Sequence, residues 1–435
     1  MTAWSLEPPA PQRIQSTGSD EIQFFARTAA AGDNLITGER LMAPYHAVLL
    51  DVTAGIKSDL TEITPSMVGG PARGYRVKLQ QLRGGTSDGV ELIHVDNGAM
   101  SFSLIPTRGM GIWKAQRQDL ALGWSSPVRG PVHPHYVPLS EPSGLGWLDG
   151  FDELLVRCGL ESNGAPEFDS ATGRLRYPLH GRIGNQPAHR VTVTVNGETG
   201  QITVTGVVDE VRFHFLKLRM TTRVTTQVGQ PGLQICDEIE NLSAKPAEMQ
   251  LLYHINFGAP LLEAGGQFVA PVKIVVPRNS HSASRIGGWD RYAAPEPGFG
   301  EQVYFLALRG DPSGQTRALL TNAHRTRGVS LTFDLRQLPC FTVWKNTTAL
   351  ADGYVTGLEP GTNYPNPRSF EGEQGRVVNL AGGAKKTFGL GLEAHISAEE
   401  VEVARREVKR LQGTEAPKIF NEPQPGWWIE SAGTT

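Results

Sequence analysis

The stretch of sequence that decides the fold covers residues 189–243 and reads HRVTVTVNGETGQITVTGVVDEVRFHFLKLRMTTRVTTQVGQPGLQICDEIENLS. Apolar and polar residues alternate along four successive runs, which is the pattern of strands that bury one face. Short segments rich in glycine, such as NGETG and VGQPG, separate the runs and are typical of turns. Sequential antiparallel strands joined by such turns form a meander, so this stretch predicts a large antiparallel sheet.

The same alternation extends in both directions from this stretch. Upstream, residues 89–116 read as a hairpin whose turn is Asp96-Asn97-Gly98, and further alternating runs follow residue 300. More than a dozen strands do not fit one open sheet without splitting or curling. We therefore expect an all-β fold with few helices, in which two large antiparallel sheets pack face to face.

One helix and three regions are expected along the 435 residues. Residues 397–413 (SAEEVEVARREVKRLQG) predict a helix that Ser397 caps and Gly413 ends. Residues 1–70 lack a sustained pattern, and we interpret them as an N-terminal extension packed on the main domain. Residues 71–396 would form the β domain, and residues 397–435 a C-terminal helix and tail.

Composition narrows the classes of function. The chain has 41 basic and 44 acidic residues, a formal net charge of -3, which shows no bias toward nucleic acid or an anionic membrane. No apolar stretch approaches the roughly 18 residues of a membrane span, and the start resembles no secretory signal, so we expect a soluble, cytoplasmic protein. The three cysteines are widely spaced and predict neither a disulfide framework nor a structural zinc site.

Polar side chains gather at three places where apolar strands begin or end. The first is a bend before residue 190, the second interrupts the apolar run LLYHINFGAPLL, and the third follows the strand CFTVW and runs on to GLEPGTNYP. In order along the chain, the polar and aromatic residues are His180, Arg182, Asn185, His189, His254, Asn256, Trp344, Lys345, Glu359 and Asn363. Glu359 is the strongest candidate, because burying a carboxylate at the end of a buried strand costs free energy unless another group pairs with it.

Each of these residues also has a purely structural interpretation. A lone histidine such as His254 is more often a satisfied core residue than a functional one. Glu359 would equally cap a loop, Arg182 brace a turn, and Trp344 belong to an ordinary core. Taken one at a time, the residues leave both interpretations open.

Taken together, five segments resemble the galactose mutarotase-like group, and within it the uncharacterised aldose 1-epimerase-related branch of the DUF4432 type. The segments are IPTRGMGI, GWLDGFDELLVRCGL, YPLHGRIGNQPAH, YHINFGAPLL and GLEPGTNYP, and they follow the order of that group from about residue 80 to residue 395. The sequence departs from the group at Arg182, which replaces a glycine, and at His254-Ile255-Asn256-Phe257, which is one residue tighter than the usual element.

The resemblance implies a β-supersandwich with a sugar site on one sheet, and an aldose 1-epimerase that interconverts the anomers of a hexose or modified sugar. It places the general base at Glu359, the general acid at His180 and the second histidine at His254. At neutral pH this pairing requires burial and pairing to keep the histidine protonated. The expected substrate-binding residues around them are Arg108, Asp152, Arg182, His189, Asn256, Trp344 and Lys345.

Only proton transfers are needed for this reaction, so no cofactor and no metal are expected, and the expected partner is a small-molecule sugar. A homodimer is compatible with the sequence. Two alternatives remain open. One is a carbohydrate-binding protein without catalysis, since a fold does not fix an activity. The other is a different sugar isomerase or lyase, in which His180, His189, His254 and Glu359 would hold a metal ion.

Overall fold

The computed structural model describes residues 43–429, and within them the dominant elements are two large sheets. Sheet A has ten strands, in the spatial order β17 (Gln267–Val269), β20 (Gln315–Thr321), β21 (Gly328–Asp334), β25 (Lys385–His395), β15 (Gly232–Asn241), β14 (Lys217–Gln227), β13 (Gln201–Val211), β12 (Arg190–Asn196), β1 (Tyr45–Asp51) and β2 (Ile56–Lys57). The four strands β12 to β15 are consecutive neighbours, which confirms the meander predicted from residues 189–243.

Sheet B contains fourteen of the described strands and is antiparallel except where β26 joins β18. Its main path runs β26 (Lys418–Ile419), β18 (Val272–Pro277), β19 (Gln302–Leu308), β22 (Cys340–Asn346), β23 (Val355–Gly361), β16 (Ala247–Gly258), β9 (Leu155–Leu160), β7 (Gly111–Arg117), β6 (Ser101–Ile105), β5 (Glu91–Asp96), β4 (Arg76–Gln81) and β3 (Glu62–Ile63). Two short strands pair beside this path, β8 (Leu120–Leu122) with β7 and β24 (Val378–Leu380) with β16.

The remaining described elements are short, apart from one helix. They are the hairpin β10 (Glu167–Phe168) and β11 (Leu175–Tyr177), the helices α1 (Pro65–Val68), α2 (Ser280–Ser284), α3 (Arg368–Glu373) and α4 (Ala398–Gln412), and the 3-10 turns η1 (Gly85–Ser87), η2 (Pro134–Tyr136), η3 (Gly146–Gly150), η4 (Ile183–Asn185), η5 (Ile286–Gly288) and η6 (Leu350–Asp352). Helix α4 confirms the predicted helix, since the Ser397 side chain accepts from the Glu400 N–H and Gly413 follows the last turn.

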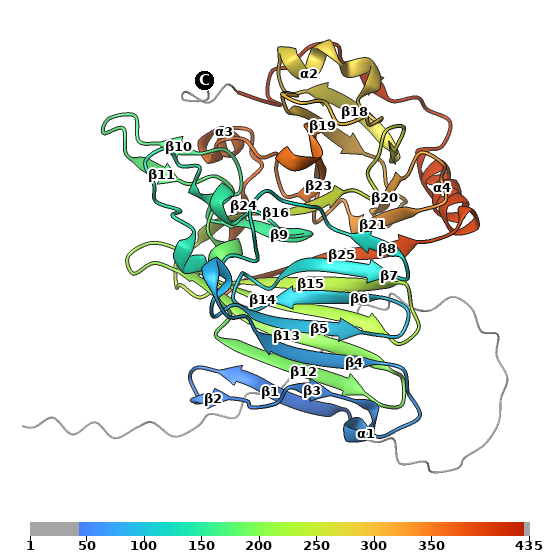
Figure 1. Cartoon of the computed structure of the whole chain (residues 1–435). Helices are drawn as coiled ribbons and strands as arrows, with labels where there is room; N and C mark the ends of the chain where they lie inside the picture. Colours follow the sequence, from blue (N-terminus) through green and yellow to red (C-terminus); the bar gives the residue numbers. More distant parts are fainter. Residues whose placement is uncertain (1–42, 430–435) are drawn as a thin grey trace, which may run out of the picture. The chain divides into compact units, whose positions relative to one another are not determined.

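The two sheets pack face to face, which confirms the predicted all-β sandwich. Figure 1 shows strands β4 to β7 of sheet B lying over strands β12 to β15 of sheet A. The main core lies between the two layers, where Val204, Met220 and Ile235 of sheet A share one apolar cluster with Phe102 and Ile112 of sheet B. This arrangement leaves the other face of sheet B for loops, and the candidate site lies there.

Part of the expected N-terminal extension pairs with the two sheets. Residues 45–63 supply β1 and β2 to the edge of sheet A and β3 to the edge of sheet B, so this part of the chain belongs to the sandwich itself. Strands of only two to seven residues are too short to give a sustained periodic pattern. The rest of the proposed extension, residues 1–42, lies outside the described residues.

Candidate active site

A histidine and a glutamate from neighbouring strands meet on the outer face of sheet B. His254 lies on β16 and Glu359 on β23, and these strands pair with Ile255 opposite Leu358. The His254 Nε2 atom lies 3.3 Å from the Glu359 Oε1 atom, and both side chains are buried. The sequence therefore brings two of its predicted catalytic residues into direct contact.

The alternation of β16 explains why these groups face outward. Leu251, Tyr253 and Ile255 belong to the main core between the sheets, whereas Leu252 belongs to a separate cluster on the outer face. Because successive side chains of a strand point to opposite faces, His254 lies on the same side as Leu252. The loops of residues 123–186 cover this face with Trp124, Trp147 and other apolar side chains.

A loop that clamps onto the end of β9 carries His180. The Gly159 N–H donates to the His180 carbonyl, and the Arg182 N–H donates to the Gly159 carbonyl. Gly181 has a φ of +73°, and a Cβ there would lie 1.9 Å from the Ser162 carbonyl oxygen, so only glycine permits this close approach. The clamp holds the His180 ring with its centroid 5.2 Å from that of His254.

Aromatic rings surround the two imidazoles. The Trp147 ring lies 4.6 Å from His180 and 5.9 Å from His254, and Phe151 lies 5.2 Å from His254, all between centroids. On the next strand but one from His254, the half-buried Trp344 ring lies 5.6 Å from that imidazole. Such a belt excludes water from the imidazoles and offers aromatic faces on which the C–H side of a sugar packs well.

Glycine at position 357 allows this packing because it has no side chain. A Cβ at Gly357 would lie 2.5 Å from Glu359 Oε1, 3.1 Å from His254 Cε1 and 3.2 Å from Trp344 Cε3. No side-chain atom fits at such distances. The carboxyl group, the imidazole and the indole therefore pack directly against the Gly357 backbone.

Hydrogen bonds fix the tautomers of both histidines. The Asn256 amide nitrogen donates to the carbonyls of Glu153 and His254, so its Oδ1 is the acceptor that faces His254 Nδ1 at 2.7 Å. His180 Nδ1 likewise faces a carbonyl, that of Asn163, at 3.0 Å. Both Nδ1 atoms therefore carry the hydrogen, and both Nε2 atoms are free to exchange a proton.

The pKa of Glu359 is raised, whereas the pKa values of His180 and His254 are lowered. Burial, together with the negative charge of Glu301, raises the pKa of Glu359 to about 8, while Arg278 opposes this rise. Burial lowers the pKa of His180 to about 4 and that of His254 well below its usual value. The expected condition that burial keeps the histidine protonated is thus not met, because removal from water disfavours the charged imidazole.

Three polar residues that sequence reasoning missed complete the cluster. Glu301 accepts from Trp344 Nε1 at 2.8 Å and from Arg278 Nη2 at 2.6 Å. Burial alone would raise the pKa of Glu301, but Arg278 and Trp344 outweigh it and lower the pKa. Thr342 lies directly opposite Glu359 in the pairing of β22 with β23. Its buried hydroxyl has no partner among the described residues, which marks an unused hydrogen-bonding group beside the carboxyl.

Two of the predicted binding residues support loops near the site. Arg108 is fully buried, pairs with Glu153 at 2.6 Å and donates to the carbonyls of Val132 and Gly150. Asp152 accepts from Trp113 Nε1 at 2.6 Å and lies 3.4 Å from Lys114 Nζ; burial raises its pKa to about 6 against both partners. These contacts engage Arg108 and Asp152 with protein groups, so we leave them out of the proposed sugar contacts.

Three further candidates lie away from the cluster. Lys345 follows Trp344 on the same strand and so points to the opposite face, where its ammonium donates to the carbonyls of Gly288 and Arg291. His189 lies 3.3 Å from Asp209 of sheet A. Burial raises the pKa of Glu210 on β13 to about 7, and the charge of nearby Arg182 opposes this rise. None of the three contacts the His254–Glu359 pair.

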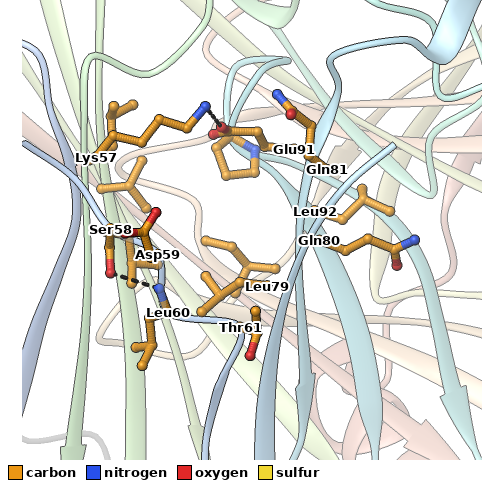
Figure 2. A pocket seen from close by; sticks show the side chains of 15 residues that line it. Lys57, Ser58, Asp59, Leu60, Thr61, Leu79, Gln80, Gln81, Glu91 and Leu92 are labelled. Carbon is orange, nitrogen blue, oxygen red and sulfur yellow. Dashed lines mark hydrogen bonds and ion pairs between the residues drawn. The ribbon is translucent and has the colours of Figure 1, made fainter. Parts of the chain in front are cut away.

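A pocket of about 220 Å³ lies elsewhere, at the edge of the sandwich where β1 and β2 face β4 and β5 (Figure 2). Leucines such as Leu60, Leu79 and Leu92 line part of it, and the ion pair of Lys57 with Glu91 lies along one side. Polar side chains such as Asp59, Gln80 and Glu91 also line this pocket, but it holds no imidazole, so we do not assign the acid–base chemistry to it.

Two findings concern other classes of site. Residues 43–429 contain no group of three or more histidine, cysteine, aspartate or glutamate side chains arranged to hold a metal ion. Over the same residues, every helix is too short or too polar to cross a membrane.

Comparison with known proteins gives the family. The model of a family described as a domain of unknown function, DUF4432, matches residues 87–394. The chain belongs to the DUF4432 family. A crystal structure of a "putative aldose 1-epimerase" from Klebsiella pneumoniae is 33% identical and superimposes with a TM-score of 0.84, covering 88% of this chain and 99% of that one.

More distant structures share the fold of this DUF4432 protein. A galactose mutarotase-like protein from Clostridium acetobutylicum is 12% identical, with a TM-score of 0.50 over 74% of this chain and 98% of that chain. The Slr1438 protein from Synechocystis is 14% identical, with the same TM-score over 73% of this chain and all of that chain. No curated protein matches the chain. These likenesses agree with the galactose mutarotase-like sandwich expected from the sequence.

Proposed function

We propose that this DUF4432 protein is an aldose 1-epimerase that interconverts the anomers of a hexose or modified sugar by acid–base catalysis. The observation that carries the proposal is the convergence of Glu359, His254 and His180 on the outer face of sheet B. The Klebsiella relative, whose name includes the same activity, supports it. These residue types suit proton transfer, and they need no cofactor for it.

In the proposed reaction, Glu359 takes the proton of the anomeric hydroxyl O1 while His180 gives a proton to the ring oxygen. The ring C–O bond then breaks to leave an open-chain aldehyde. Rotation about the adjacent C–C bond presents the other face of the carbonyl, and the two groups return their protons as the ring closes. Each positioned acid or base typically contributes about 10²–10⁴-fold to such a rate.

The reaction requires one proton on the pair of Glu359 and His180. In the empty site burial places that proton on Glu359, since its pKa is raised to about 8 and that of His180 is lowered to about 4. We propose that a bound sugar reverses this order, because its hydroxyl groups replace the hydration that the carboxylate lost. The His254 Nε2 atom, 3.3 Å from Glu359, is the nearest group that can receive the proton during this change.

The residues around the pair suit a polyol. Trp344 presents a half-buried indole beside His254, and the Thr342 hydroxyl next to Glu359 is unused. Glu301 and Arg278 add a carboxylate and a guanidinium at the partly exposed side of the cluster. We therefore propose Trp344, Thr342 and Glu301 as the main sugar contacts, with Asn256 acting through His254.

The experiment is anomeric exchange measured by saturation-transfer NMR on a panel of free, phosphorylated and oxidised sugars. Exchange above the spontaneous rate for at least one sugar is expected, and Glu359→Gln and His180→Ala should each reduce it at least a hundredfold while the protein stays folded. If both variants match the wild type, the proposed mechanism is wrong.

A carbohydrate-binding protein without catalysis is the second candidate. The raised pKa of Glu359 favours it, because a protonated carboxyl group binds a hydroxyl well but is a poor base. Saturable sugar binding in titration calorimetry, with anomeric exchange no faster than in buffer, would support this candidate over the epimerase.

A further inference from the structure

A cavity of about 430 Å³ lies along one side of helix α4, and none of the residues that line it belongs to the candidate active site. Arg405, Arg406 and Lys409 line it from the helix, and Arg325 lines it from the turn between β20 and β21. Glu402 is the one carboxylate among the residues that line the cavity. Four cations against one anion form a strongly positive site on a chain whose formal net charge is -3.

These cations are poorly neutralised by the described protein. Arg405 lies 4.0 Å from Glu402, and its buried Nη1 atom has no hydrogen-bond partner within residues 43–429. Over the same residues, no carboxylate lies within ion-pair distance of Arg325, Arg406 or Lys409. Burial and the charge of Arg325 lower the pKa of Arg405 against the pull of Glu402, so like charges face one another here.

Neighbouring cations outside the cavity behave differently. Arg410, one residue beyond Lys409, pairs with Glu407 at 2.7 Å, and Arg327, two residues beyond Arg325, pairs with Asp119 at 3.0 Å. The negative end of the helix dipole accounts for a lysine in the last turn such as Lys409. It does not account for Arg325, which belongs to a different segment.

The turn that carries Arg325 is rigid and strained. The Asn322 side chain accepts from the N–H groups of Thr326 and Arg327. Arg325 has a φ of +56°, in the left-handed region that an arginine rarely adopts. The turn therefore holds a fourth cation at the cavity despite both backbone strain and charge repulsion.

We propose that this cavity binds a phosphoryl group, either as free phosphate or on a small organic molecule. Arginine forks match phosphate oxygens in geometry, and a dianion placed between Arg325 and Arg405 would relieve their repulsion. The apolar side chains Val269 and Val408 close one wall and reduce screening by solvent. The site is separate from the proposed sugar site, since α4 packs on β20 of sheet A.

The test measures binding of inorganic phosphate to the full chain by titration calorimetry and by thermal unfolding, in phosphate-free buffer with ionic strength held constant by sodium chloride. Phosphate is expected to bind and to raise the unfolding midpoint. Arg405→Gln and Arg325→Gln should each weaken binding about tenfold or more, as loss of a charge-assisted hydrogen bond does. Arg410→Gln is the matched control on the same helix and should bind like the wild type.

Two outcomes would overturn the proposal: chloride at equal ionic strength gives the same stabilisation as phosphate, or Arg410→Gln loses as much affinity as the other two variants. Without phosphate, Arg405→Gln should unfold no earlier than the wild type, because it removes repulsion. If that variant does not fold, Arg325→Gln at the exposed turn still decides the question. Titration with glycerol phosphate distinguishes the sources, since tighter binding than inorganic phosphate identifies a phosphate ester as the ligand.

Discussion

His254 Nε2 lies 3.3 Å from Glu359 Oε1 although neither group is ionised in the way that a salt bridge requires. Burial favours the neutral imidazole and the protonated carboxyl group, and Asn256 fixes the hydrogen of His254 on Nδ1. The contact is therefore a neutral pair that can pass one proton. This property makes the pair suitable for a reaction in which each group must both take and return a proton.

The first prediction concerns the pH dependence of kcat/KM for anomeric exchange. The free enzyme needs one proton on the pair of Glu359 and His180. Activity should fall as pH drops through about 4, where His180 gains a second proton, and as pH rises through about 8, where Glu359 loses the last one. A broad plateau is expected between the two limbs. An acid limb near the ordinary histidine pKa of about 6.5, with no alkaline limb, would contradict the pKa shifts.

The second prediction concerns Thr342, whose buried hydroxyl is unused. Thr342→Val removes the hydroxyl without changing the shape of the side chain. If the hydroxyl binds the sugar, kcat/KM should fall about 3–10-fold, the loss expected for one neutral hydrogen bond. Stability to denaturant should stay the same or increase, because an unsatisfied buried polar group is removed.

A matched control for this variant is Thr316→Val on sheet A. The Thr316 hydroxyl donates to the Arg309 carbonyl, so its loss should reduce stability by about 1 kcal/mol and leave activity unchanged. Equal activity of Thr342→Val and the wild type would remove Thr342 from the site.

The third prediction concerns Gly357→Ala. The new methyl group would lie 2.5 Å from Glu359 Oε1 and must displace the carboxyl group, the His254 imidazole or the Trp344 indole. Activity should fall by more than tenfold, and overpacking should destabilise the protein by about 1–3 kcal/mol. The control is Gly287→Ala, where a Cβ meets no atom within 4 Å. Full activity of Gly357→Ala would show that the close packing of these three groups is not required.

The fourth prediction concerns the ion pair of Arg108 with Glu153, which we interpret as a support for the loop that carries Trp147 and Phe151. Both side chains are buried, so Arg108→Met should destabilise the protein by about 3–5 kcal/mol through the unpaired carboxylate. Adding Glu153→Gln should recover part of this loss in denaturant titrations. A sum of the two single effects in the double variant would contradict a direct interaction.

The sequence predicts the sheets well because their signal is local. Alternation over residues 189–243 appears directly as the burial pattern of β12 to β15. His254 and Asn256 were also predictable as a pair, because residues two apart on one strand share a face. The same rule separates Trp344 from Lys345, since consecutive strand residues face opposite ways. Applied to both residues, it would have placed Lys345 in the interior of the sandwich.

Other parts of the site depend on contacts that no local pattern reveals. Glu301 precedes the almost wholly buried strand β19, and only the pairing of β19 with β22 brings it to the Trp344 indole. Arg108 looks like a ligand-binding residue until Glu153, 45 positions later, is seen to neutralise it. The pKa order of Glu359 and His180 follows from burial by the aromatic loops, which their own neighbours in the sequence do not indicate.

A crystal structure of the protein soaked with a sugar from the panel would test the central claim most directly. We expect the sugar on the outer face of sheet B, with O1 and the ring oxygen within about 3.2 Å of Glu359 and His180 and its C–H face against Trp344. A sugar bound only in the pocket of Figure 2, or at the site with its anomeric carbon turned away from both groups, would contradict the account.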